Sequence, residues 1–191
     1  MTPVRPRLID YKSVDEALRD LCDGFTAAQI AATTVHEVGP DEIPPPFHDL
    51  LVHHDHMTTT LTGHYGRPVE LRVLHEQIED DLYHRQVVLT PTGSDTIVEC
   101  GLVRIDLSFT TEPVREAILR RDTPLGDILI EHDVLRRIEP RWYLRLGPQA
   151  RLLKSFDCAT AFDTYGRVGT IYCDDQPAIE LLEVVTGAPL E

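Results

Sequence analysis

The pattern of apolar positions predicts a first helix near the N-terminus and an irregular connection after it. Ser13 and Glu16 have the spacing of a helix-capping pair, and apolar residues then recur at helical period up to Gly24. The segment 39–46 contains four prolines, which are poorly compatible with regular structure. It therefore predicts a linker.

A second helical pattern follows this linker, and beyond it the apolar positions change from helical to alternating period. One apolar stripe runs from Phe47 to Tyr65, and Gly66 is placed to end that helix. The alternating stretches that follow predict three strands, at Pro68 to Ile78, Leu82 to Thr90 and Thr96 to Leu107. A short loop joins the last two, which predicts that they are antiparallel neighbours.

The rest of the chain contains a helical region and then more strands. Helical stretches at Thr111–Arg121 and Asp127–Leu135 are separated by Thr123–Gly126, where Pro and Gly interrupt the pattern. The strands predicted after them are Trp142 to Leu146, Arg167 to Cys173 and Ala178 to Val185, the last two joined by a hairpin turn. Strands that come in runs indicate an α+β fold, an antiparallel β-sheet with helices packed on one face.

Length and composition indicate a single domain. A chain of 191 residues with 42% hydrophobic residues can bury one sizeable core. We therefore expect residues 1–46, an N-terminal helix and a proline-rich linker, to belong to the same domain as residues 47–191.

Charge and targeting signals narrow the classes of partner. The formal net charge of −14 repels phosphate backbones and anionic lipid headgroups, so we expect neither nucleic acid nor a membrane as partner. A small anionic aromatic or pre-aromatic substrate remains compatible, because one or two arginines in a pocket set the local potential. The first twelve residues lack the apolar stretch of a signal peptide, and the four cysteines form no paired motif, which predicts a cytoplasmic protein.

Several short motifs occur in an order that carries a resemblance. Leu51–Leu61 reads LVHHDHMTTTL, with Met57 after an acidic residue. Arg85 lies on the predicted strand Leu82 to Thr90, and Gly101 lies on the following predicted strand. Leu125 lies in a Thr-Pro-Leu-Gly turn. In this order and spacing the motifs resemble those of the chorismate lyase (chorismate pyruvate-lyase) family, in a divergent branch.

The resemblance implies a function and a set of site residues. It implies a carbon–oxygen lyase that removes pyruvate from chorismate without a cofactor, leaving a hydroxybenzoate, most simply 4-hydroxybenzoate. Met57 would line the substrate pocket, Arg85 would bind the ring carboxylate, and Leu125 would donate its backbone N–H to the same carboxylate. A glutamate near the end of the chain would contact the substrate hydroxyl, which makes Arg85 and Glu183 the catalytic candidates.

Two glutamates compete for that last role. Glu180 and Glu183 lie on one predicted strand, and residues three apart on a strand point to opposite faces. Only one of them can therefore reach the pocket, and we favour Glu183 because the residues around it match the family better.

Other interpretations of the same residues remain open. Arg85 shares its predicted strand face with apolar residues, but an exposed arginine in a weak ion pair is the commoner case. Most of the histidines lie between His48 and His84. At helical spacing His53 fits a pair with Asp49 as well as one with His56, so the sequence defines no set of metal ligands and we expect no metal. His54 shares the helical face of Met57 and could reach the pocket.

Two further functions fit the same scaffold. The chain could act on a different small carboxylate by elimination or dehydration, or it could be a stand-alone protein that binds an aromatic acid. The short, acidic N-terminal segment has no basic recognition helix, which argues against a DNA-binding regulator.

Overall fold

The computed structural model describes residues 11–22, 35–148, 150–158 and 160–190. The first ten residues, on which much of the signal-peptide prediction depends, lie outside the described residues. In the described part of the chain, no helix is both long and apolar enough to cross a membrane.

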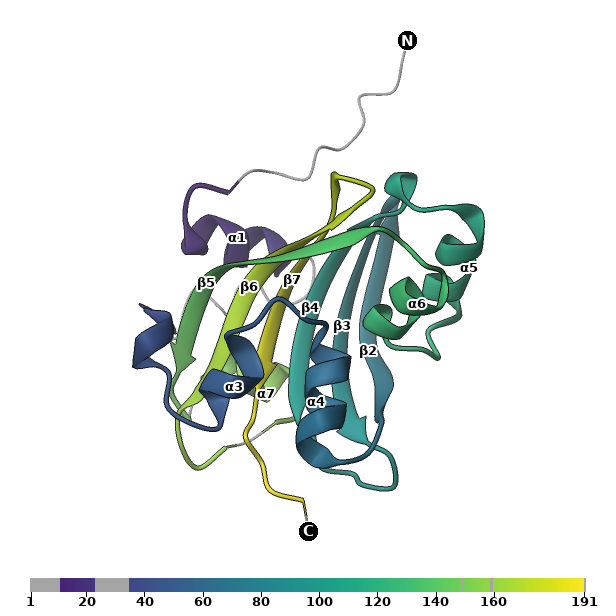
Figure 1. The fold of residues 1–191 in the computed structure, drawn as a ribbon. Helices are drawn as coiled ribbons and strands as arrows, with labels where there is room; N and C mark the ends of the chain where they lie inside the picture. The colour runs from purple at the N-terminus through teal and green to yellow at the C-terminus, as the bar shows by residue number, and fades with distance from the viewer. Residues whose placement is uncertain (1–10, 23–34, 149, 159, 191) are drawn as a thin grey trace.

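A single antiparallel sheet organises the described residues (Figure 1). The order of its strands is β1-β5-β6-β7-β4-β3-β2, and every neighbouring pair is antiparallel. The strands are β1 (Val35–Val38), β2 (Val69–Glu79), β3 (Leu82–Pro91), β4 (Glu99–Asp106), β5 (Arg136–Leu146), β6 (Thr164–Cys173) and β7 (Gln176–Val185). The predicted α+β fold with an antiparallel sheet is confirmed.

Helices cover the sheet. They are α1 (Val14–Leu21), α3 (Phe47–Leu51), α4 (Met57–Tyr65), α5 (Glu112–Arg120), α6 (Leu125–Glu131) and α7 (Arg151–Ser155), with short 3-10 helices at Pro40–Glu42 and Leu107–Phe109. On one face, α3 and α4 pack on one part of the sheet and α5 and α6 on another. On the opposite face, α1 and α7 cover a separate apolar cluster. The helices predicted from apolar stripes in the middle of the chain all lie on the first face.

Strand alternation explains why both faces of the sheet are apolar. Along β7, Leu181 and Val185 belong to the clusters under α3 to α6, whereas Leu182 and Val184 belong to the cluster under α1 and α7. Every residue of β4 is buried, because this strand lies in the middle of the sheet between β3 and β7. A polar side chain on either face of these strands must therefore find a partner or line a cavity.

The structure differs from the predicted elements in two places that shape the functional site. The helix expected from Phe47 to Tyr65 is broken, since α3 ends at Leu51 and α4 begins at Met57. The helix expected to reach Leu135 ends at Glu131, and β5 already begins at Arg136. The helix cannot continue to Leu135 because Asp133 adopts a positive φ of 50°. From Arg136 onward, β5 pairs with β6 along its whole length.

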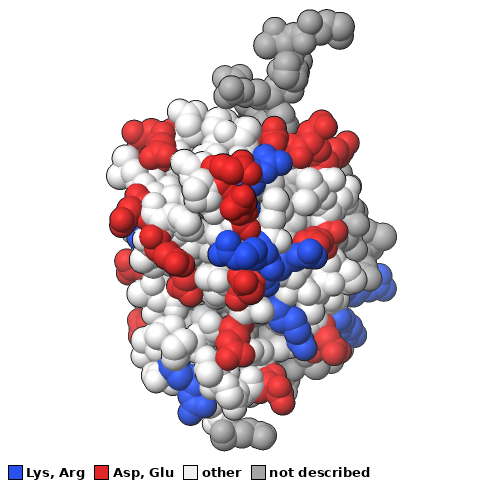
Figure 2. Space-filling view, turned by 90° about the vertical axis from the view of Figure 1, so that its right-hand side faces the viewer, with Lys and Arg blue, Asp and Glu red and all other residues white. Residues whose placement is uncertain are grey.

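Acidic and basic side chains are intermixed on the side of the molecule that carries α5 and α6 in Figure 1. Figure 2 shows acidic groups spread over this face and basic groups gathered near its middle. Arg115 and Arg120 of α5 form ion pairs with Asp81 and Asp122, with N···O distances of 2.7 and 3.7 Å. This face therefore offers no uninterrupted basic surface.

Candidate functional site

A cavity lies between the sheet and the helices α4 and α6. Its walls are mainly apolar and include side chains of five strands, Leu71, Val87, Leu89, Val103, Ile171 and Leu181. Gly126 allows α6 to approach α4 closely, because a Cβ atom at this position would lie only 2.6 Å from the Thr58 hydroxyl oxygen. The cavity is narrow, about 50 Å³.

The four predicted site residues meet in this cavity. Met57 at the start of α4, Arg85 on β3, Leu125 at the start of α6 and Glu183 on β7 all line it. The structure thus brings together residues that are up to 126 positions apart in the sequence. The roles proposed for them from the family resemblance, including an N–H contact from Leu125, remain predictions.

Arg85 is the charged group most deeply buried in the cavity wall. It is 1% exposed, and its Nε and Nη1 atoms have no hydrogen-bond partner. No aspartate or glutamate among the described residues forms an ion pair with it. Burial lowers the pKa of Arg85, while Tyr83 and Glu76 act against that shift, and a guanidinium keeps its charge in proteins. The cavity therefore contains a cation with two unpaired nitrogen donors.

Glu183 has a partner that the sequence did not suggest. Its carboxylate accepts a 2.6 Å hydrogen bond from Nε of Arg167, which lies beside it on β6. The same guanidinium donates to the carbonyl oxygens of Leu51, at 3.1 Å, and His53, at 2.9 Å. Arg167 thereby holds the break between α3 and α4 against the sheet, and it occupies the carboxylate of Glu183.

Glu99 is an acidic cavity residue that sequence reasoning missed. It lies on β4, is 4% exposed, and its Oε2 atom has no hydrogen-bond partner. Burial raises its pKa well above the usual range, the nearby charge of Glu183 raises it further, and Arg167 acts in the opposite direction. The available signal was a glutamate inside an otherwise apolar strand, Ile97–Val103.

This raised pKa predicts a dependence of stability on pH. The unfolded chain releases the Glu99 proton near pH 4 to 5, whereas the folded protein keeps it to higher pH, so the free energy of unfolding falls as pH rises through this range. Glu99→Gln cannot ionise, and we expect it to raise the free energy of unfolding at pH 7–8 by about 1–3 kcal/mol. Chemical denaturation from pH 4 to 8 measures the free energy of unfolding. We expect it to change less with pH in Glu99→Gln than in the parent protein.

The control is Glu79→Gln, at an exposed position at the end of β2, which should leave the profile unchanged. A loss of stability in Glu99→Gln at neutral pH would mean that Glu99 is ionised and stabilised by Arg167.

Glu180 lies on the opposite face of the sheet, as strand alternation requires. Its carboxylate accepts a hydrogen bond from the hydroxyl of Tyr11, at 2.8 Å, and forms an ion pair with Arg104, at 2.9 Å. Arg104 also pairs with Asp20 of α1, at 2.7 Å. Glu180 therefore belongs to a polar network beneath α1 and does not reach the cavity.

The histidines are dispersed among different partners. His53 contacts the carbonyl oxygen of Leu50, at 2.8 Å, and His54 contacts that of Ile138, at 3.0 Å. His56 lines the cavity and accepts a hydrogen bond from Arg136. In the described ranges, no group of three or more His, Cys, Asp or Glu side chains is arranged to hold a metal ion.

Comparisons with known proteins identify relatives by fold only. No family model and no curated protein matches the chain. Solved structures of similar fold include the effector domain of PhnF from Mycobacterium smegmatis, 13% identical, with a TM-score of 0.46 over 70% of this chain and 89% of that one. A GntR-family transcriptional regulator from Enterococcus faecalis V583 is 7% identical, with a TM-score of 0.43 over 63% of this chain and 96% of that one.

A second PhnF structure from the same organism is 12% identical, with a TM-score of 0.46 over 69% of this chain. The chain spans 64% of the length of that PhnF chain. At these identities the likeness concerns the fold alone.

The sequence-based assignment to the chorismate lyase family is wrong, and with it the predicted lyase activity that would release pyruvate and a hydroxybenzoate from chorismate. The structures of similar fold named above are described as a transcriptional regulator and an effector domain. The physical reason is that a strand arginine, a methionine and a Thr-Pro-Leu-Gly turn shape a cavity, and a fold of this kind does not specify a reaction. Glu183, the predicted catalytic acid or base, is already paired with Arg167.

Proposed function

We propose that this chain is a small-molecule-binding domain whose cavity takes the acid group of an organic carboxylate. The observation that carries the proposal is Arg85, a buried guanidinium with Nε and Nη1 unpaired at the wall of an apolar cavity. A guanidinium binds a carboxylate in bidentate fashion through either of two edges, Nε with Nη2 or Nη1 with Nη2, and each edge of Arg85 contains one of these unpaired atoms.

Electrostatic balance supports this assignment. With Glu183 paired to Arg167 and the raised pKa of Glu99 favouring its neutral form, the cavity has one uncompensated positive charge, at Arg85. Burying such a charge is costly unless an anion neutralises it. A bound carboxylate supplies that charge and an acceptor for an unpaired N–H group of Arg85.

The other lining groups set the shape of the site. Met57 and the strand side chains would surround the first carbons of the ligand, and the narrow space favours a flat or unbranched acid. The structure from PhnF is described as an effector domain. A sensing role for this chain belongs to our proposal and is compatible with a cavity that binds its ligand without transforming it.

Thermal melting with a panel of acids tests the proposal. Monocarboxylates such as benzoate, 4-hydroxybenzoate and hexanoate are each compared with the corresponding amide or alcohol. We expect at least one acid to raise the melting temperature in a concentration-dependent way, since a ligand that binds only the folded state stabilises it. The neutral analogues should leave the melting temperature unchanged. Equal effects of acids and amides, or no effect of any acid, would contradict the proposal.

A further inference from the structure

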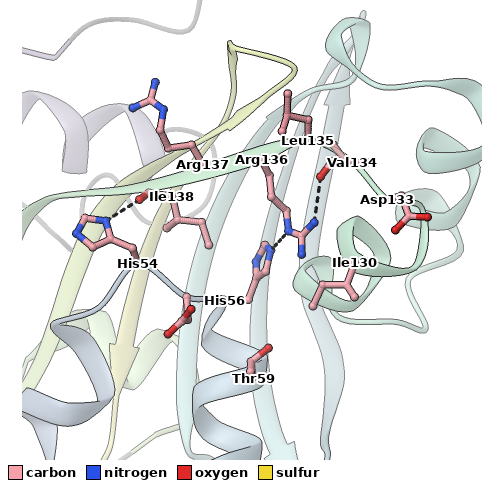
Figure 3. Close-up of a pocket in the computed structure, with 11 residues that line it drawn as sticks. His54, His56, Thr59, Ile130, Asp133, Val134, Leu135, Arg136, Arg137 and Ile138 are labelled. Carbon is pink, nitrogen blue, oxygen red and sulfur yellow. Dashed lines mark hydrogen bonds between the residues drawn. The ribbon is translucent and has the colours of Figure 1, made fainter.

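An open depression adjoins the cavity and shares the lining residue His56 with it. It is formed by the start of α4, the end of α6 and the start of β5, and its volume is about 770 Å³ (Figure 3). His56 lines both the depression and the cavity. The narrow cavity has room for little more than an acid group, so the rest of a larger ligand must lie elsewhere.

Arg136 is the half-buried cation of this depression. Its Nε donates to Nε2 of His56, at 2.5 Å, and its Nη1 donates to the carbonyl oxygen of Val134, at 3.0 Å; both bonds are drawn in Figure 3. Both acceptors are uncharged. Burial, together with the charges of Arg136 and Arg167, lowers the pKa of His56 to about 4, so its imidazole is neutral at physiological pH.

The charge of Arg136 is therefore not neutralised by a nearby acid. Across the described parts of the chain, no carboxylate oxygen is within ion-pair distance of its guanidinium. A guanidinium has five N–H donors, so donors remain for a ligand while Nε and Nη1 keep their present bonds. Arg136 thus resembles Arg85, a cation with hydrogen-bonding capacity and no counter-charge.

The other charged groups of the depression differ from Arg136. Arg137 forms an ion pair with Glu139, and its guanidinium lies 4.1 Å from the ring centre of Tyr172. Asp55 and Asp133 also line the depression, but both are exposed, so solvent and salt screen their repulsion of an anion. An anion that enters the depression is best placed beside Arg136.

Apolar groups lie beside this position. Ile130 and Leu135 line the depression and are 41% and 65% exposed, which is unusual for large aliphatic side chains in this molecule. They offer a contact for the hydrocarbon part of a ligand.

We propose that the depression is the second compartment of the same ligand site and that the ligand has two acid groups, one bound by Arg85 in the cavity and one by Arg136. This inference rests on the function proposed above, and it adds that the ligand is a dianion, with its hydrocarbon part passing His56 toward Ile130 and Leu135. Arg85 in the cavity and Arg136 in the depression both lack an ion-pair partner among the described residues, and a ligand with two negative charges would match them.

The experiment compares straight-chain dicarboxylates of four to ten carbons with monocarboxylates of the same length, by titration calorimetry at fixed ionic strength. At the length that bridges the two arginines, we expect the dicarboxylate to bind at least tenfold more tightly than its monocarboxylate. Arg136→Gln should reduce this ratio to about two or less and leave the affinity of the monocarboxylate unchanged. Arg136→Lys should retain part of the tighter binding of the dicarboxylate relative to the monocarboxylate.

Arg137→Gln is the matched control, because it removes a neighbouring arginine of the same depression that already has an acidic partner. It should leave both affinities unchanged. The inference is overturned if dicarboxylates have no advantage at any length, or if Arg136→Gln, melting like the parent, keeps the full ratio. Monocarboxylate binding that depends on Arg85 would then still uphold the proposed function, whereas a chain that binds neither class of acid contradicts both.

Discussion

Arg85→Ala is expected to weaken carboxylate binding by on the order of 2–5 kcal/mol, the usual cost of removing one partner from a buried charge pair. Arg85→Lys should recover only part of this loss, because an ammonium group cannot reproduce the planar fork that contacts both oxygens. Titration with the acid that stabilises the parent most strongly measures both effects.

Folding provides the control for this experiment. The Arg85 side chain has two unpaired polar atoms and no ion pair. Its removal should therefore change the free energy of unfolding of the ligand-free protein only slightly. Arg85→Met, which better preserves the packing of the wall, should melt at or above the temperature of the parent. If Arg85→Ala binds the acid as tightly as the parent does, the anchor lies elsewhere. A large drop in melting temperature without ligand would instead identify Arg85 as a structural residue.

Arg167→Met should destabilise the protein by about 3–5 kcal/mol, because it leaves the carboxylate of Glu183 buried without its partner. The substitution also removes the donors that hold the carbonyl oxygens of Leu51 and His53, so the break between α3 and α4 loses its attachment to the sheet. Urea denaturation followed by circular dichroism measures the change.

Arg145→Met on the neighbouring strand β5 is the matched control. Arg145 forms an exposed ion pair with Asp163, at 3.8 Å, and its loss should change stability by less than about 1 kcal/mol. The double variant Arg167→Met with Glu183→Gln should recover part of the stability, since no unpaired carboxylate then remains at position 183. A loss below about 1 kcal/mol in Arg167→Met would show that water or Glu99 rearranges to compensate.

The sequence determined those features that depend on residues close together in the chain. Alternation along the last strand was enough to predict that Glu180 and Glu183 face opposite sides of the sheet, and Glu183 does line the cavity. The alternation of side chains along β3 likewise predicted that Arg85 lies on the same strand face as apolar residues. The period of the apolar positions predicted the antiparallel sheet and most of its strands, because burial of one face imposes that period locally.

Only the tertiary structure decided how the polar groups are paired. Arg167 and Glu183 lie 16 residues apart, Arg136 and His56 lie 80 apart, and Tyr11 and Glu180 lie 169 apart. No local pattern encodes such contacts, and the cost of burying a charge depends on them. The same applies to the break between α3 and α4, which an apolar stripe cannot reveal because Arg167 of a distant strand stabilises it. The residues that the family resemblance singled out line one cavity, but the resemblance did not give the function, because the chemistry of a cavity depends on which of its polar groups are paired, and that depends on the tertiary structure.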